Sequence, residues 1–256
     1  MQVPNYATVM ILLLSVVDTA NGLPFGSATE EVLVFFGNGC FWGRQKDYVD
    51  VERQTLRRSD EEITALVGYA GGHSERGGPV CYYSGPPARH YDRLGHAEVT
   101  QVSLVGSPED LTQQLRAFAR MYFSQFNRVS GGMERLDPQD AGLGYRNVVG
   151  LPGGMQGALF GDFADMNVNN MVLLPGEGGE EDTFNTVYVM DSNQFPFFQA
   201  EMYHQFHNGM GHRFGREYTF QLRMMHEKLG RVRRTRCPER GESISSMEDN
   251  EAAFDL

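Results

Sequence analysis

Cysteine, positive charge and long apolar runs are all scarce in this chain of 256 residues. Three cysteines cannot build a disulfide framework, and their odd number points to a thiol with a chemical role. Lysine and arginine total 22 against 33 aspartates and glutamates, and the resulting net charge of −11 argues against nucleic acid as a partner. A membrane-spanning helix needs roughly 20 consecutive apolar residues. The composition therefore points to a folded domain with a reactive cysteine.

The longest apolar stretch near the N-terminus, residues 9–17, is too short to span a bilayer. Ala20 and Gly22 follow it with the small side chains of a signal cleavage site. The stretch lacks the usual basic residues before it, so a buried N-terminal strand or helix is the alternative. We expect residues 1–22 to be a signal for the secretory pathway or an organelle; without such a signal the protein would be cytoplasmic.

The rest of the chain has the composition of a folded domain, with 41% hydrophobic and 11% aromatic residues. Strands and helices interleave without regular βαβ spacing, which indicates one α+β domain, residues 23–230. Residues 231–256 turn first basic and then acidic and are expected to form a flexible tail. Strands are expected at 31–36, 63–69, 96–105, 145–150 and 186–190, and helices at 44–58, from Pro108 to Phe126, at 198–207 and at 216–229.

The segment Gly39-Cys40-Phe41-Trp42-Gly43 is the most informative one. Cys40 falls where a strand would turn into a helix, and the N–H groups and dipole at a helix start favour the reactive thiolate. Phe41 and Trp42 would place an apolar wall beside the thiol, suited to a small group such as a methyl. The residues alone leave a second interpretation open, a buried structural cysteine in an aromatic core.

This segment resembles the active-site signature of the A-type peptide methionine sulfoxide reductases. Four further segments resemble motifs of that family in the same order, so that the resemblance covers residues 33–207. They are Val67-Gly68-Tyr69-Ala70-Gly71-Gly72, Gly95-His96-Ala97-Glu98-Val99, Asp140-Ala141-Gly142-Leu143-Gly144-Tyr145-Arg146 and Ala200-Glu201-Met202-Tyr203-His204-Gln205. The resemblance implies a two-layer α/β sandwich with a mixed sheet and a ferredoxin-like plait core. It also implies thiol-dependent reduction of methionine-S-sulfoxide, free or in proteins.

The resemblance assigns catalytic roles to five residues. Cys40 attacks the sulfoxide and ends as a sulfenic acid, and Glu98 protonates the oxygen, for which it needs a raised pKa. Tyr69 and Tyr145 hold the oxygen through neutral hydroxyls, and Asp140 orients the site. By pattern alone, Glu98 could equally be an exposed strand carboxylate, the tyrosines core residues and Asp140 a turn residue.

The resemblance further implies that Phe41, Trp42 and His96 contact the substrate. Family members often carry recycling cysteines in a C-terminal tail, which makes Cys237, among arginines, the expected resolving thiol in a Cys40–Cys237 disulfide. Cys81 is its rival, because its loop leads directly into the segment of Glu98. Either cysteine could also be a bystander.

No bound cofactor or metal is expected, since His204, His207 and His212 lack a cysteine or acid that would complete a metal site. The reductant implied is thioredoxin or another dithiol, and the partners are methionine sulfoxide or oxidised proteins, as in repair under oxidative stress. We expect a monomer with no nucleic-acid partner and, once the signal is removed, no membrane span.

The chain also departs from the family pattern. Gln45 stands where the family usually has an acid, and Gly144 stands where it has glutamine. The loop between Tyr69 and Glu98 is longer than usual, and residues 136–139 replace the customary Arg-Gln-Gly. These departures leave two alternatives: a non-catalytic relative that binds methionine or its sulfoxide, and another cysteine enzyme, which would need a histidine partner for its thiol.

Overall fold

A seven-stranded mixed sheet in the order β7-β8-β6-β1-β3-β2-β9 organises the chain. The computed structural model describes residues 30–74, 78–83, 89–209, 211 and 213–240, so the expected signal segment lies outside it. The strands of the sheet are β1 Glu30–Gly37, β2 Leu66–Ala70, β3 Ala97–Gly106, β6 Val148–Leu151, β7 Val172–Pro175, β8 Thr186–Asp191 and β9 Phe198–Gln199. β1 pairs antiparallel with β3 and β6, whereas β8 runs parallel to β6 and β7. The predicted α+β class and mixed sheet are confirmed.

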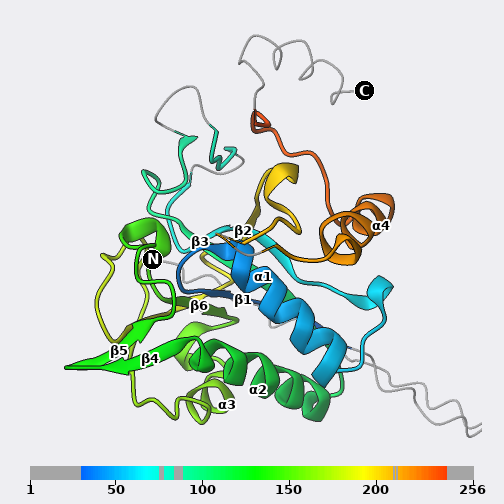
Figure 1. Cartoon of the computed structure of the whole chain (residues 1–256). Helices are drawn as coiled ribbons and strands as arrows, with labels where there is room; N and C mark the ends of the chain where they lie inside the picture. Colours follow the sequence, from blue (N-terminus) through cyan, green and yellow to red (C-terminus); the bar gives the residue numbers. More distant parts are fainter. Residues whose placement is uncertain (1–29, 75–77, 84–88, 210, 212, 241–256) are drawn as a thin grey trace, which may run out of the picture.

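Two helices lie across one face of this sheet, α1 Phe41–Asp50 and α2 Pro108–Ser124 (Figure 1). α2 begins as its sequence predicts: the Ser107 hydroxyl accepts from the Asp110 amide, and the Asp110 carboxylate accepts from the Ser107 amide. The residues of α2 that face the sheet recur at steps of three and four along the helix, as expected for a helix that buries one apolar stripe. Its buried residues are Leu111, Leu115, Ala117, Phe118, Ala119, Tyr122 and Phe123.

The alternation of side chains along β1 divides the core into two parts. Val34 and Phe36 face the helices, where the Phe36 ring stacks on Tyr48 of α1 at 5.3 Å. Phe35 points to the opposite face and packs with Val99 and its neighbours under the segment around residues 195–197. Because β1 is central and buried at its end, the turn that follows it is fixed on a rigid support.

The predicted helix at 198–207 is wrong. β9 pairs with β2, so that Phe198 lies opposite Tyr69, and only a 3₁₀ turn, Met202–His204, follows. A long-range partner, the Glu239 carboxylate, accepts from the Met202 amide at 2.8 Å, and sequence periodicity carries no information about such a bond. The helix expected at 216–229 is present as a π-helical turn, Glu217–Leu222, continued by α4 Arg223–Lys228.

Other element boundaries also differ from expectation. The helix predicted at 44–58 begins earlier, at Phe41, and continues after Asp50 only as a π-helical turn, Val51–Thr55. Three further elements were not predicted: β4 Phe126–Val129 and β5 Gly132–Arg135, which form a hairpin, and the short α3 Phe160–Ala164.

The first part of the expected tail belongs to the folded body. Val232 and Cys237 are buried, and Arg231 donates to the Ile63 carbonyl at 3.0 Å. A flexible tail beginning at residue 231 is therefore wrong for residues 231–240, and the rest of that segment lies outside the described residues. Within the described part of the chain, no helix is long and apolar enough to cross a membrane.

Candidate active site

Cys40 is the residue immediately before α1, as the sequence predicts. The chain leaves β1 through Asn38 and Gly39, and Gly39 takes a positive φ of 94° that favours glycine. The Gly39 amide donates to the Tyr145 carbonyl at 2.9 Å, and the buried Arg44 donates from Nε to the Asn38 carbonyl at 3.2 Å. These bonds tie the turn that carries the thiol to two other parts of the fold.

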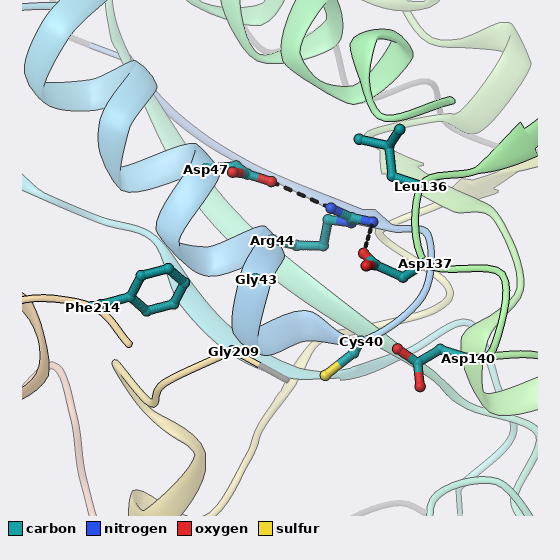
Figure 2. Close-up of a pocket in the computed structure, with 9 residues that line it drawn as sticks. All are labelled: Cys40, Gly43, Arg44, Asp47, Leu136, Asp137, Asp140, Gly209 and Phe214. Atoms are coloured by element: carbon teal, nitrogen blue, oxygen red, sulfur yellow. Dashed lines mark hydrogen bonds and ion pairs between the residues drawn. The ribbon is translucent and has the colours of Figure 1, made fainter. Parts of the chain in front are cut away.

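A pocket of about 450 Å³ lies beside the thiol (Figure 2). Cys40 and Asp140 border it together, and Arg44 lies next to them, bound to Asp137 at 2.6 Å and to Asp47 at 3.4 Å. Asp137 belongs to the segment that departs from the family pattern. That segment therefore supplies a carboxylate that pairs with Arg44. Among the described residues that line the pocket, Arg44 is the only strongly buried cation.

The expectation of a lowered thiol pKa is wrong. Burial raises the pKa of Cys40 well above its ordinary value, and the negative charge of Glu98 raises it further. The Trp42 amide at the helix start lowers the pKa, as the sequence argument anticipated, but more weakly than burial raises it. Cys40 is thus a neutral thiol near pH 7 in the absence of substrate.

Glu98 has the properties that the predicted acid requires. Its side chain is on β3, is 2% exposed and accepts the Phe41 amide on Oε2 at 3.0 Å. Burial is the main cause that raises its pKa, to about 8. The helix start thus brings together the neutral Cys40 thiol and a carboxyl that is largely protonated at neutral pH.

Asp140 and Tyr145 are at this site, as predicted. The Asp140 carboxylate receives the Cys40 amide, and burial raises its pKa. Its Oδ2 is buried without a hydrogen-bond partner among the described residues. Tyr145 ends a 3₁₀ turn, Leu143–Tyr145, and is half-buried, with its hydroxyl in the field of Glu98.

Tyr69 is placed differently from expectation. It is fully buried, and its hydroxyl donates to Glu201 Oε2 at 2.8 Å. The other oxygen of Glu201 accepts the Tyr82 amide at 2.7 Å. Glu201 therefore connects β2 to the long loop between Tyr69 and Glu98, which we call the inserted loop. Its place in the last motif did not reveal this role.

Tyr91 is a further residue of this site that no sequence motif contains. Its ring stacks on Tyr69 with centroids 4.7 Å apart, and its hydroxyl donates to Glu98 Oε1 at 3.4 Å. Nothing in the local pattern of residues 73–94 distinguishes this tyrosine from the others of the loop. Only the folding of the loop back onto β2 and β3 brings it to the acid.

The two aromatic residues after Cys40 have different environments. Phe41 is 1% exposed and belongs to the core around Tyr69, whereas Trp42 is half-buried. The Trp42 indole donates to His204 Nδ1 at 3.2 Å and stacks on His207 at 4.2 Å. Burial lowers the pKa of His204 to about 3, so this imidazole is a neutral acceptor. Of the two predicted contacts, Trp42 is the better exposed to a substrate.

His96 has a structural rather than a substrate-binding environment. It is 1% exposed, its Nδ1 accepts the Gly72 amide at 3.1 Å, and its ring packs edge-on against Phe198. Burial lowers the pKa of His96 to about 4. This neutral histidine holds the turn after β2, and the contact with substrate predicted for it is not supported.

Gln45 explains one departure from the family pattern. It is fully buried, donates to the Ala65 carbonyl at 2.9 Å and accepts the Phe206 amide at 2.6 Å. A carboxylate could not make the first bond, because it has no proton to donate when ionised. Gln45 is thus part of the scaffold under α1.

The two remaining cysteines form a disulfide with each other. Cys81 and Cys237 are joined with a Cα–Cα distance of 5.5 Å, and Cys40 is free. The Cys40–Cys237 pair that we predicted is therefore not the pair in this structure, because Cys237 is packed against the inserted loop, with its Sγ 3.2 Å from the Val80 carbonyl. Cys81, Cys237 and Glu201 bring three potential metal ligands within 4.8 Å, but the two bonded sulfurs are not thiolates in this state.

No family model matches the chain. The curated peptide methionine sulfoxide reductase MsrA of Pseudomonas aeruginosa is 27% identical to it over 187 residues, which are 71% of this chain and 70% of that protein. Among solved structures, methionine sulfoxide reductase A of Corynebacterium diphtheriae is similar at 16% identity and a TM-score of 0.42, covering 72% of this chain and 74% of that one. Mxr1 of Saccharomyces cerevisiae in its reduced form is similar at 24% identity and a TM-score of 0.39, covering 68% of this chain and 82% of that one.

The sequence match and the motifs agree with each other. The similarity to the Pseudomonas protein extends over about 70% of both chains, and the five motifs follow the family's order. The structure brings Cys40, Glu98, Asp140 and Tyr145, which come from separate motifs, to one site. The chain is thus similar to a curated A-type peptide methionine sulfoxide reductase in sequence and resembles that family in the order of its motifs.

Proposed function

We propose that this protein reduces methionine-S-sulfoxide, free or within proteins, to methionine. The observation that carries the proposal is the pairing of Cys40 with Glu98 at the start of α1. The amide next to the thiol holds the carboxyl at 3.0 Å, and burial raises the pKa of that carboxyl to about 8. A nucleophile and a proton donor are both needed to take an oxygen from a sulfoxide.

The first step can be balanced with groups of this site. The Cys40 sulfur attacks the sulfoxide sulfur while Glu98 donates its proton to the oxygen, and the thiol proton restores Glu98. The oxygen is transferred to Cys40, which becomes a sulfenic acid, and methionine leaves with the electron pair. Methionine sulfur is reduced by two electrons and cysteine sulfur is oxidised by two. Cys40 enters the step as a neutral thiol, so its own proton completes this exchange once its sulfur attacks.

The sulfenic acid then needs a second thiol. We propose that Cys237 attacks Cys40, displacing water and forming a disulfide, and that Cys81 next attacks Cys237 and releases Cys40 as a thiol. The support for this order is the state of the cysteines, with Cys81 and Cys237 oxidised together and Cys40 free. An external dithiol such as thioredoxin would return both to thiols.

The physiological setting is part of the same proposal. If residues 1–22 direct the chain into a secretory or organellar compartment, the dithiol donor there would differ from a cytoplasmic thioredoxin. Repair of oxidised methionine in proteins by a monomer is the setting that the family resemblance suggests.

One observation favours a second candidate, a relative that binds methionine sulfoxide without reducing it. The Cys40 thiol has a raised pKa in the free protein, and a neutral thiol is a poor nucleophile. Such a binder would keep its affinity in Cys40→Ser and would release no methionine.

A stereospecific turnover assay separates the two. The wild-type protein and dithiothreitol are incubated with a peptide that contains both epimers of methionine sulfoxide. We expect loss of the S epimer only, no turnover by Cys40→Ser, and one equivalent of methionine from Cys81→Ser before any reductant is added. Binding without turnover by the wild-type protein would instead establish the second candidate.

A further inference from the structure

Three potential metal ligands form a cluster outside the described lining of the Cys40 pocket. Cys81 comes from the inserted loop, Glu201 from the last motif and Cys237 from the last described segment. One ligand atom of each residue lies within 4.8 Å of the other two. Cys81 and Glu201 are fully buried, and Cys237 is 2% exposed. Reduction of the bridge therefore leaves two thiols beside a carboxyl group that is shielded from water.

Glu201 is anchored to the inserted loop by a contact that does not involve the sulfurs. Its Oε1 accepts the Tyr82 amide at 2.7 Å, and its Oε2 accepts the Tyr69 hydroxyl at 2.8 Å. Tyr82 follows Cys81 directly in the chain, so the first bond holds the carboxylate next to that cysteine. Carboxylates that bind metals in proteins are themselves oriented by hydrogen bonds of this kind.

The segment of Cys237 has an anchor of its own. The Glu239 carboxylate accepts the Met202 amide at 2.8 Å. Glu239 is two residues after Cys237, and Met202 follows Glu201 directly. Hydrogen bonds thus connect all three segments in addition to the disulfide. We expect the cluster to persist when the bond between the sulfurs is reduced.

Two thiolates and one carboxylate are ligands that suit Zn²⁺. Zinc binds cysteine sulfur at about 2.3 Å and carboxylate oxygen at roughly 2.0–2.2 Å, so the ligand atoms of a tetrahedral ion are roughly 3.5–3.8 Å apart. Atoms that lie within 4.8 Å of one another can reach these separations by side-chain rotation once the sulfurs are no longer bonded. The soft sulfurs favour Zn²⁺ over Mg²⁺ and Ca²⁺, which prefer oxygen ligands. A bound cation would also offset the cost of burying the ionised carboxylate.

We propose that the reduced protein binds one Zn²⁺ through Cys81, Cys237 and Glu201, and that formation of the disulfide releases the ion. Binding moves no electrons, because each thiol gives one proton to solvent as its sulfur takes the metal. Disulfide formation removes two electrons from the two sulfurs, which are then no longer thiolate ligands. The redox state of one cysteine pair thus sets the occupancy of the site.

The oxidant that empties the site is the Cys40 sulfenic acid, and this part of the inference rests on the proposed reductase function. The sulfenic acid accepts the two electrons, its oxygen leaves as water, and Cys40 returns to a thiol while Cys81 and Cys237 join. When both thiolates start bound to the metal, the exchange takes up two protons and releases Zn²⁺. One ion is therefore released for each methionine formed in the absence of a reductant.

Metal uptake tests the site without any turnover. The full chain is reduced with a phosphine, because dithiols bind zinc themselves, and is then dialysed against Zn²⁺ without oxygen. We expect one Zn²⁺ per chain by elemental analysis for the reduced wild type, and none for the protein with its bridge intact. Cys40→Ser is the matched control and should bind like wild type, because it removes the cysteine outside the cluster. Cys81→Ser should lose the binding.

Two further measurements identify the ligands. Glu201→Gln removes the charge at nearly constant size, and we expect its affinity for Zn²⁺ to fall by about 10-fold or more. Protection from alkylation needs no variant: Zn²⁺ should slow the reaction of Cys81 and Cys237 with iodoacetamide in the reduced wild type and leave that of Cys40 unchanged. Mass spectrometry assigns the label to each cysteine. Protection of Cys40 alone would contradict the assignment.

Release of the ion is followed with a chelator that changes colour when it binds free Zn²⁺. One equivalent of methionine-S-sulfoxide should release one equivalent of Zn²⁺ from the loaded wild type and none from loaded Cys40→Ser. No uptake by the reduced wild type, equal uptake by Cys81→Ser, or retention of the ion after the disulfide has formed would overturn the inference. Uptake by a wild-type protein that forms no methionine would confirm the metal site and overturn the proposed function instead.

Discussion

Glu98 is held in its neutral form by the surrounding fold. It lies on the central strand pair with 2% of its surface exposed, and burial raises its pKa from 4.5 to about 8. A carboxylic acid with this pKa can donate a proton at neutral pH and recover it from the Cys40 thiol. The sequence could not give this value, because a strand glutamate is more often exposed, and only the helix and loop packed above it remove the water.

This residue gives the enzyme a defined pH dependence. Activity needs the protonated carboxyl, so we expect kcat to decline as the pH rises through about 8. Glu98→Gln should keep much of the activity, because its amide can still donate a hydrogen bond to the oxygen and the Cys40 thiol can supply the proton, and it should lose the alkaline decline. Glu98→Ala should lose far more. Steady-state rates from pH 6 to 9.5 check this, and equal losses in the two variants would mean that proton transfer itself is required.

The same carboxyl links stability to pH. Its pKa is higher in the folded state than in the unfolded state, so the folded protein binds more protons between pH 4.5 and about 8, and stability declines as the pH rises through this window. The decline from this group is roughly 5 kcal/mol and is complete above pH 8. Urea unfolding of wild type and Glu98→Gln at pH 5 and pH 9 isolates it. The variant should be the more stable protein at pH 9, and parallel pH profiles would contradict the argument.

At the scale of elements, local signals were sufficient for β1, β3 and α2. Each of these carries its pattern in its own residues: an apolar run, an alternation, or a cap followed by a buried stripe. The 198–207 segment could not be predicted in this way, because pairing with β2 and a bond to Glu239 decide its conformation. The residues of the candidate site also divide into those that local sequence reveals and those that depend on long-range packing. Cys40, Glu98, Asp140 and Tyr145 were found through motifs, but Tyr91 depends on the path of a long loop.

The start of α2 offers a prediction that involves no catalytic group. The Ser107 hydroxyl accepts the Asp110 amide at 3.3 Å, so Ser107→Ala leaves that donor without its cap. We expect a loss of about 1 kcal/mol in the free energy of unfolding with kcat unchanged. Ser124→Ala is the matched control at the other end, because its hydroxyl bonds only within the last turn, to Met121. Losses of the same size in both variants would mean that capping is not the cause.

At the scale of the whole molecule, one bond joins segments that are far apart in sequence. The bridge between Cys81 and Cys237 spans 156 residues and connects the inserted loop to the last described segment. Closing a loop of this length restricts the unfolded chain and stabilises the fold by up to about 5 kcal/mol in the chain-entropy model. The chain thus uses a covalent bond to retain a loop that the family pattern does not contain.

Reduction should therefore lower the melting temperature. We expect a fall of about 10 °C when excess dithiothreitol is added to wild type, since each kcal/mol shifts a domain of this size by a few degrees. Cys40→Ser should show the same fall, because its bridge is intact. Cys81→Ser should melt at the lower temperature with or without reductant, and a melting point that responds to reductant in Cys81→Ser would assign the effect to another group.

The bridge also gives the molecule the topology of a ring with an arm. Residues 81–237 form the ring, and the arm that precedes it carries β1, α1 and the nucleophile. Cys40 is therefore on the arm, whereas its acid, Glu98, is within the ring. A protease cut inside the ring opens it without releasing a fragment, whereas a cut between Cys40 and Cys81 detaches the nucleophile. A gel without reductant would show the first kind of cut as a single band of full mass and the second as two bands. The ring thereby keeps acid, phenols and scaffold on one covalent body even when a peptide bond within it is broken.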